Sequence, residues 1–486
     1  MADHVRVMVQ VKSSTSLAAT SFSTYAASPF LAGALPGGVE IDSSYSPVPI
    51  PARAQGAAPM FNMSPGTGLA APAPEGAFEP FNFGFEAAPA APVPATYVVR
   101  GSVEAAYLPQ FLEKSKDNPN IVGVFSDPVI KPVATCPSGP MGTDRDVAAR
   151  LAVSKLAAKG MTGAGVKVVI VDTGVNLKYL QQRGKTPAFD SLLSWGPQRN
   201  QPLGNMPVGH GTMCAYDVCI AAPECTLVDH ALLTSTASGG SVMDGFLSDA
   251  VASYGVLLGY LMKAPEPFAG DVLPRTLVIN NSWGMFHPSW DFPVGSPGNY
   301  SDNPRHPFNI IVASLEAAGA DILFAAGNCG PECPDSRCQG ATAEGIYGAN
   351  SSPAVTSVAG VVITGDRVGY STKGPGRLDH NKPDIASYTH FAGSGVYEAD
   401  GGTSAATPVL TGVVAAIRRL YPASVLSPAR LRELLRQTAD SRGSHDEYGA
   451  GVINVEKLVQ ELENLQKPAG QPQQQGKKVK IPVHQP

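Results

Sequence analysis

Five short apolar runs recur in the chain after residue 145, and segments of helical character separate them. Apolar runs of this length between helices are typical of parallel strands that are buried on both faces. The sequence therefore predicts an α/β fold in which helices cover both faces of a mostly parallel sheet. The runs are Val166–Val171, Thr226–Ala231, Thr276–Asn280, Ile322–Ala326 and Val355–Ala359.

The length and charge of the chain limit the number of structural units and the kinds of partner to be expected. The chain has 486 residues, more than one hydrophobic core usually organises, so two or three units are expected. A formal net charge of -5 argues against nucleic acid or an anionic membrane as an obligatory partner. No apolar run is long enough for a membrane span. Residues 1–12 alternate apolar and polar residues instead of forming a secretory signal, which favours a cytoplasmic location and leaves signal-independent export open.

The N-terminal part is predicted to hold a small domain with an unstructured interruption. Residues 1–26 include a possible first strand, with alternating valines on one face. Residues 27–95 show no helical or strand period, and 22 of the 45 residues in 51–95 are Ala or Pro. This composition predicts a disordered linker or insertion, because it offers too little apolar burial to offset the entropy of ordering. Residues 96–130 then follow a strand–helix–strand pattern.

Three further boundaries follow from composition. Residues 131–145 are rich in Pro and Gly, which predicts an exposed connector where processing would occur. Residues 146–465 are expected to form the main α/β domain. Residues 466–486 consist mostly of Gln, Gly, Pro and Lys, which predicts a flexible tail.

A serine lies in the most distinctive stretch of the sequence, Gly-Gly-Thr-Ser-Ala-Ala-Thr-Pro-Val at residues 401–409. The stretch runs into an apolar segment that is long enough for a buried helix. Ser404 would lie in the positive field of the helix N-terminus, which favours negative charge developing as a nucleophile attacks a carbonyl. For Ser404 taken alone, a helix-capping role is the alternative.

Three upstream motifs carry compatible chemistry. Asp172 ends an apolar strand, where ligands gather in parallel sheets, although a loop-start role is commoner for a single Asp. His210 lies in Gly-His-Gly-Thr and would open a helix, whereas an isolated histidine is usually structural. Asn328 follows Ala-Ala-Gly in a strand–turn, where an amide suits donation to an oxyanion or serves as a turn residue.

Together these motifs resemble the signatures of the subtilase (subtilisin-like) serine proteases, over roughly residues 146–455. The order Asp172, His210, Ser404 is the subtilisin order of the Asp-His-Ser triad. The resemblance implies a three-layer α/β/α domain and a serine endopeptidase that forms an acyl-enzyme. It also implies that Asn328 and the Ser404 backbone N–H stabilise the oxyanion. No cofactor and no metal is expected, since no Asp/Asn cluster resembles a calcium loop.

The resemblance extends to substrate and inhibitor. It implies that a protein or peptide substrate pairs with Ser282, Trp283 and Gly284, while Ala325, Ala326 and Gly327 form a pocket wall. It also implies that residues 96–130 belong to an inhibitory propeptide, so that the chain is its own N-terminal partner in a self-inhibited precursor. An unrelated small α+β module is the alternative for this unit. A peptide-binding pseudoprotease and a protease dedicated to one partner are the alternative functions.

Seven cysteines complete the sequence picture. Cys329, Cys333 and Cys338 directly follow the Asn328 turn, where a local disulfide that leaves one thiol over is favoured above a zinc site or fully reduced cysteines. Cys219 and Cys225 flank a Pro-containing turn and form a candidate second pair.

Overall fold

The computed structural model describes residues 4–12, 35–50, 96–132, 139–235, 244–262 and 276–466. Its largest feature is a seven-stranded sheet in the order β15-β14-β13-β11-β7-β9-β8, with every neighbouring pair parallel. The five predicted strands are confirmed to within two residues, whereas the short β8 and β15 were not predicted. The strands are β7 (Lys167–Val171), β8 (Ala188–Phe189), β9 (Thr226–His230), β11 (Leu277–Asn281), β13 (Asp321–Ala325), β14 (Thr356–Val361) and β15 (Ile385–Tyr388).

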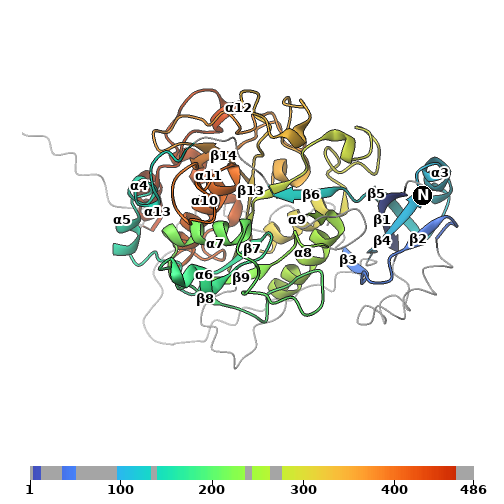
Figure 1. The fold of residues 1–486 in the computed structure, drawn as a ribbon, viewed down its shortest axis with the longest axis horizontal. Helices are drawn as coiled ribbons and strands as arrows, with labels where there is room; N and C mark the ends of the chain where they lie inside the picture. The colour runs from blue at the N-terminus through green and yellow to red at the C-terminus, as the bar shows by residue number, and fades with distance from the viewer. Residues whose placement is uncertain are drawn as a thin grey trace, which may run out of the picture.

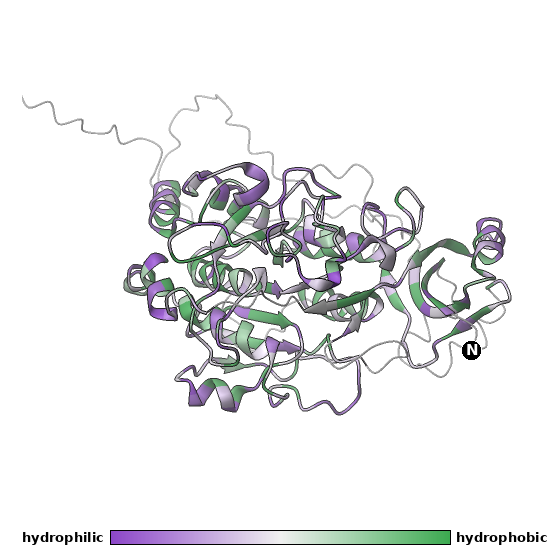
Figure 2. Cartoon of the chain, turned by 45° about the horizontal axis from the view of Figure 1, so that its top comes forward, coloured by the Kyte–Doolittle hydropathy of each residue, from purple (hydrophilic) through white to green (hydrophobic). Residues whose placement is uncertain are grey.

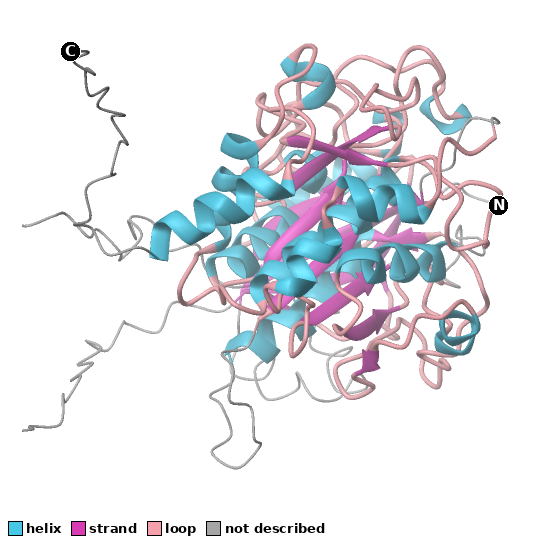
Figure 3. Ribbon diagram, turned by 90° about the vertical axis from the view of Figure 1, so that its left-hand side faces the viewer, coloured by secondary structure: helices cyan, strands magenta, loops and turns pink. Residues whose placement is uncertain are grey.

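Helices cover both faces of this sheet, which confirms the three-layer α/β/α architecture (Figures 1 and 3). Val168 and Ile170 of β7 point into one core, which includes residues of α7 (His210–Ala221) and α10 (Thr403–Arg418). Val169 and Val171 point into the opposite core, with α8 (Leu247–Met262) and α9 (Pro307–Ala317). Hydrophobic residues accordingly dominate the inner strands in Figure 2.

Further helices lie around these layers. They are α4 (Asp144–Arg150), α5 (Val153–Ala158), α6 (Leu177–Gln182), α11 (Pro428–Thr438), α12 (His445–Tyr448) and α13 (Val455–Gln466), with 3-10 turns at Pro288–Trp290, Ser336–Cys338 and Gly348–Ser351. None of the helices in the described ranges is both long and apolar enough to cross a membrane. Residues 467–486, predicted as a tail, lie outside those ranges.

The N-terminal residues form a separate antiparallel sheet beside the larger domain (Figure 1). Its central strand β1 pairs with β4 on one side and β5 on the other, although about 85 residues separate β1 from β4 in sequence. Val7, Val9 and Val11 lie buried on one face with Phe111 of the covering helix, as their alternation predicts. The elements are β1 (His4–Lys12), β2 (Val39–Ile41), β3 (Val48–Ile50), β4 (Thr96–Glu104), α3 (Leu108–Lys116) and β5 (Ile121–Ser126).

The prediction that residues 27–95 are disordered is wrong for residues 35–50. Strands β2 and β3 both pair with β4, and Val48 and Ile50 are buried in the core that contains α8 and α9. Long-range packing orders this segment, and no local periodicity reveals it. Residues 27–34 and 51–95 lie outside the described residues.

The prediction of an exposed connector over residues 131–145 is wrong at both ends. Residues 131–132 complete strand β6 (Val129–Pro132), which lies between β10 (Gly245–Phe246) and β12 (Trp283–Gly284). Residues 144–145 begin α4, whose N-terminus Thr143 caps through a reciprocal hydrogen bond with Asp146. The proline and glycine content of this segment indicates neither the strands that pair with β6 nor the helix that begins at Asp144. Residues 133–138 lie outside the described ranges.

Candidate active site

The fold brings the four motif residues together at one edge of the sheet. Asp172 directly follows β7, and Asn328 lies in the turn after β13. His210 begins α7, and Ser404 lies in the first turn of α10. All four side chains are buried.

Asp172 holds the imidazole of His210 from one side. The two carboxylate oxygens of Asp172 lie 2.8 and 2.9 Å from His210 Nδ1. His210 Nε2 is buried and has no hydrogen-bond partner among the described residues. A Cβ atom on Gly211 would lie 2.6 Å from the carbonyl oxygen of Gly174, so only glycine allows α7 to start this close to the β7 turn. The arrangement leaves Nε2 free to accept a proton.

The Ser404 hydroxyl is anchored to the neighbouring strand segment. Its Oγ donates a hydrogen bond of 3.1 Å to the Ser282 carbonyl oxygen. The Ser282 hydroxyl in turn donates to the Ser404 carbonyl oxygen over 2.9 Å. This exchange fixes Ser404 beside β12, the segment that was predicted to bind substrate.

The amide of Asn328 is held beside the start of α10. Its Oδ1 accepts hydrogen bonds from the backbone N–H and the hydroxyl of Thr403, at 3.0 and 3.1 Å. Gly402 has a φ of +75°, and a Cβ atom there would lie 2.8 Å from Asn328 Nδ2. Gly402 therefore leaves the amide nitrogen close to the Ser404 backbone, as a pair of oxyanion donors requires.

Buried carboxyl groups support the loops around the site. Burial raises the pKa of Asp229 to about 7, and its carboxylate accepts hydrogen bonds from the backbone N–H groups of Val175 and Gly204. Burial likewise raises the pKa of Asp400 to about 6, and that of Asp217, beside Asp400, well above its usual range. Sequence analysis missed all three, because a single acid between apolar residues carries no motif.

A buried thiol also touches the site and was not predicted. Cys214 Sγ lies 3.7 Å from Asp172 Oδ2 and 3.7 Å from the Ser404 carbonyl oxygen. Burial, with a further contribution from the Asp172 charge, raises the pKa of the Cys214 thiol well above its usual value. Cys214 therefore stays protonated, which makes it a poor nucleophile.

The chain's own strand β6 pairs with β12, which directly follows Ser282. In the antiparallel pairing with β12, Pro132 lies opposite Trp283 and Lys131 lies opposite Gly284. On its other side, Ile130 pairs with Gly245. The carboxyl end of β6 thus lies opposite Trp283, the residue after Ser282, whose carbonyl oxygen accepts the hydrogen bond from the Ser404 hydroxyl.

A pocket next to Asn328 brings together most of the residues that were predicted to contact substrate. Gly284 and Trp283 lie on one side, and Ala326 and Gly327 on the other. The Trp283 ring is fully buried between Phe308 and Phe324, at centroid distances of 5.8 and 5.1 Å, and so belongs mainly to the core. Ser282 contacts Ser404, and Ala325 ends β13.

The cysteines differ from expectation in two respects. Cys329 and Cys338 form a disulfide in the loop after Asn328. Cys333 is also disulfide-bonded, so the predicted leftover thiol in this loop is wrong. Cys219 and Cys225 are buried free thiols, so their predicted pairing is wrong too. The Cys329–Cys338 bridge packs against Phe286 at the rim of the pocket.

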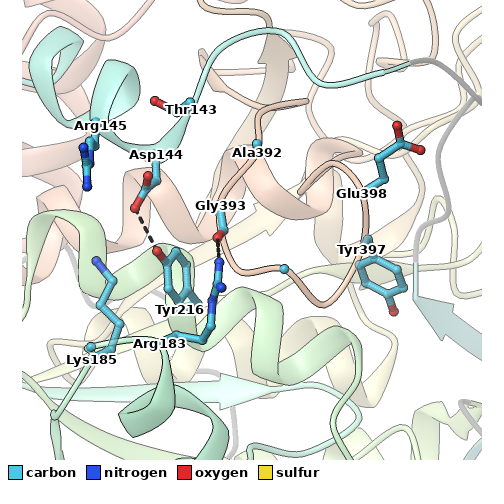
Figure 4. Close-up of a pocket in the computed structure, with 12 residues that line it drawn as sticks. Thr143, Asp144, Arg145, Arg183, Lys185, Tyr216, Ala392, Gly393, Tyr397 and Glu398 are labelled. Atoms are coloured by element: carbon cyan, nitrogen blue, oxygen red, sulfur yellow. Dashed lines mark hydrogen bonds between the residues drawn. The ribbon is translucent and has the colours of Figure 1, made fainter.

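A larger cavity of about 510 Å³ lies at the side of α7 (Figure 4). Cations and acids both line it, so it offers no single sign of charge to a ligand. Two hydrogen bonds cross it, from the Tyr216 hydroxyl to Asp144 and from Arg183 to the Gly393 carbonyl oxygen. The first contact joins the start of α4 to α7, and the second joins the loop before Ser404 to the end of α6. The charged lining residues are Asp144, Arg145, Arg183, Lys185 and Glu398.

Known proteins resemble this chain across the same region. The family model of the subtilase family matches residues 163–451. Serine protease AprX of Bacillus subtilis (strain 168) is 27% identical over 333 residues, which cover 62% of this chain and 67% of that protein. Subtilisin of Bacillus pumilus is 27% identical over 315 residues, covering 63% and 94%. Membrane-bound transcription factor site-1 protease of Homo sapiens is 27% identical over 349 residues, covering 67% and 28%. Because the family match covers more than half of the chain, this chain belongs to the subtilase family and is a serine-type endopeptidase.

Proposed function

We propose that this endopeptidase cleaves peptide bonds with a triad of Asp172, His210 and Ser404, and that it is made as a precursor inhibited by its own N-terminal domain. Ser404 Oγ attacks the peptide carbonyl while His210 Nε2 accepts its proton. The same proton then passes to the leaving amine, and water hydrolyses the acyl-enzyme by the reverse sequence. Support comes from the Asp172 carboxylate oxygens at 2.8 and 2.9 Å from His210 Nδ1, because a carboxylate there favours the tautomer with the proton on Nδ1 and leaves Nε2 to accept one.

Asn328 is proposed as the side-chain donor to the oxyanion, with the backbone N–H of Ser404 as the second donor. The two hydrogen bonds from Thr403 orient the Asn328 amide so that its nitrogen, not its oxygen, lies toward Gly402. A donor that is already oriented stabilises developing charge without reorganisation, typically by about 3 kcal/mol.

The observation that carries the inhibited precursor is the position of strand β6 between β10 and β12. An extended substrate would add a strand between β10 and β12, where β6 already lies. The predicted substrate-binding residues Ser282, Trp283 and Gly284 form this edge, and Ala325, Ala326 and Gly327 form the wall across from it. A protein or peptide substrate therefore competes with β6 for the same hydrogen bonds.

Polar contacts hold the N-terminal domain on the start of α8. Asp127 accepts a hydrogen bond of 2.8 Å from the Ser248 backbone N–H, and the Tyr45 hydroxyl donates to the Ser248 carbonyl oxygen over 2.8 Å. Arg100, which is 7% exposed, donates to Asp249 over 2.7 Å. While the domain is bound, each of these two charges is satisfied by the other, and removal of either side chain would leave its partner buried and unpaired. This interface supports a domain that stays bound until the chain is cleaved.

Labelling with a fluorophosphonate probe tests the proposed nucleophile. The probe should attach to Ser404 in stoichiometric amount, as read by peptide mapping, and Ser404→Ala should remain unlabelled. Ser282→Ala provides the matched control, since it removes a neighbouring serine and should still be labelled. Labelling of Ser404→Ala at another residue would refute the assignment.

A further inference from the structure

The pocket beside Asn328 is almost filled by the residues that line it. Its volume is about 10 Å³, which is close to the space that one water molecule needs. Three aromatic residues are among those that line it, namely Trp283, Phe286 and Tyr347, and each of them is at most 2% exposed. A methyl group is only slightly larger than a water molecule, so it fits this space, whereas a larger side chain has to displace part of the lining.

The walls of this pocket are tied together by one buried amide, that of Asn350. Its Nδ2 donates to the carbonyl oxygen of Trp283 over 2.8 Å and to that of Ala325 over 2.9 Å. Trp283 belongs to β12 and Ala325 ends β13, so a single NH₂ group links the segments that face each other across the pocket. Because Asn350 is only 5% exposed, water is poorly placed to replace these hydrogen bonds if the walls move apart. The width of the pocket is therefore fixed.

Of the three aromatic rings, that of Tyr347 is left to limit the depth of the pocket. The Trp283 ring packs in the core between Phe308 and Phe324. Phe286 packs against the disulfide at the rim. Tyr347 is the remaining aromatic residue, and its removal would enlarge the pocket without opening the substrate-binding edge or the rim.

Tyr347 is also held in place. It directly precedes the 3-10 turn Gly348–Ser351 and belongs to the core that contains α8 and α9. Its carbonyl oxygen accepts a hydrogen bond of 3.2 Å from the Asn350 backbone N–H. The carbonyl oxygen of Ile346 accepts one of 3.0 Å from the Arg377 backbone N–H, and the Arg377 guanidinium lies 5.6 Å from the centroid of the Tyr347 ring. These contacts oppose a movement of the ring away from the pocket.

We propose that the enzyme favours a small side chain, as in Gly and Ala, on the residue whose carbonyl is attacked, and that the ring of Tyr347 sets this limit. A side chain such as that of Leu or Phe would overpack a site whose walls cannot separate, which is unfavourable. This inference rests on the proposed function, since it assigns the pocket beside Asn328 to the residue that carries the scissile carbonyl.

Peptides that differ only in the residue before the scissile bond test the size limit on the unmodified enzyme. The kcat/KM for Ala should exceed the values for Leu and for Phe by about tenfold or more, because a single surplus methylene in a closed pocket already costs about 10- to 200-fold. A smaller ratio, or faster cleavage after Leu or Phe, would overturn the inference.

Two variants test whether the ring of Tyr347 sets the limit. Tyr347→Ala removes the ring, so the ratio of kcat/KM for Ala to that for Phe should fall by about tenfold or more. Tyr347→Phe is the matched control, because it keeps the ring and loses only the hydroxyl, and its ratio should stay near that of the unmodified enzyme. A general loss of stability lowers the activity on all peptides alike and leaves the ratio unchanged. An unchanged ratio in Tyr347→Ala, or an equal fall in both variants, would contradict the role of the ring.

The outcomes also separate this inference from the proposed function. Fluorophosphonate labelling of Ser404 with equal cleavage of the Ala, Leu and Phe peptides would refute the size limit alone. Absence of both labelling and cleavage would refute the proposed function itself. If Tyr347→Ala does not fold, the ratios on the unmodified enzyme still decide whether the pocket favours a small side chain, because they need no variant.

Discussion

Asn328 accepts two hydrogen bonds from Thr403, the residue before Ser404, and the first prediction concerns this amide. Asn328→Leu removes the oxyanion donor but keeps a side chain of similar size. We expect kcat to fall by about 10²–10³ with little change in KM, because the lost interaction acts mainly in the transition state. Steady-state kinetics on a peptide substrate measures both constants.

The control for Asn328 is stability. Loss of the two hydrogen bonds that Thr403 donates to Asn328 should lower the free energy of unfolding by about 1–3 kcal/mol. This loss of stability should not by itself account for the fall in kcat. A rise in KM with unchanged kcat would indicate that Asn328 binds the ground state, and it would contradict the oxyanion role.

The buried acids Asp217 and Asp400 predict a dependence of stability on pH. Burial raises both folded pKa values above those of the unfolded chain, to about 6 for Asp400, and the charge of Asp400 raises the pKa of Asp217 further. Their protonated forms therefore stabilise the fold at pH values below about 4, and this contribution is lost as the pH rises through 6. Asp217→Asn removes one titrating group while keeping its size.

The free energy of unfolding at several pH values checks this prediction. Relative to the unmodified chain, Asp217→Asn should gain stability as the pH rises from 4 to 8, because the variant has no carboxyl group to ionise in the buried site. Glu456→Gln serves as a control at an exposed site, where no comparable change is expected. A difference that is constant with pH would show that the acid pair does not titrate in this range.

At the scale of elements, residues 35–50 are predicted to strengthen inhibition. Val48 of β3 is 7% exposed, and a Cβ atom on Gly255 of α8 would lie 3.1 Å from Val48 Cγ1. A charge at this contact should loosen the N-terminal domain. We expect Val48→Asp to raise the rate at which activity appears after expression, as measured with a fluorogenic peptide.

Pro49 offers the matched control, because it is adjacent on β3 and exposed. Pro49→Asp adds the same charge without burying it, so the rate should stay near that of the unmodified chain. Equal rates for all three proteins would mean that β3 contributes little to inhibition.

Elements also show where prediction from sequence reaches its limit. Val166–Val171 and its four counterparts were found because a buried parallel strand needs a continuous apolar run. Strand β3 has only three residues, and its order depends on β4, which lies about 45 residues further on. Proline and alanine around it predicted disorder, because composition contains no information about such partners.

The residues of the candidate site likewise fall into those that could be predicted from local motifs and those that could not. Asp172, His210, Asn328 and Ser404 lie in local motifs, so their proximity could be predicted from the subtilase resemblance. Asp229 had no such signal, because its carboxylate accepts hydrogen bonds from backbone N–H groups that lie 54 and 25 residues away in sequence. Burial and long-range hydrogen bonds become visible only in the folded chain.

For the molecule as a whole, the two ends of segment 133–138 are fixed on the catalytic domain. Before it, β6 pairs with β12, and Pro132 lies opposite Trp283. After it, the Met141 N–H donates to the His390 carbonyl oxygen over 2.7 Å, and His390 Nε2 lies 3.1 Å from the Gly139 carbonyl oxygen. We therefore expect self-cleavage between Pro132 and Gly139, because β6, which leads into this segment, pairs with the strand that follows Ser282.

The most direct measurement is the intact mass, under reducing conditions, of the unmodified chain and of Ser404→Ala over time after purification. The account predicts that the unmodified chain separates into a fragment ending between residues 132 and 138 and a larger catalytic fragment, while Ser404→Ala stays whole. Addition of a small amount of active enzyme to Ser404→Ala should restore cleavage at the same bond. Cleavage of both proteins at equal rates, or of neither together with absence of fluorophosphonate labelling, would contradict a self-processing serine protease.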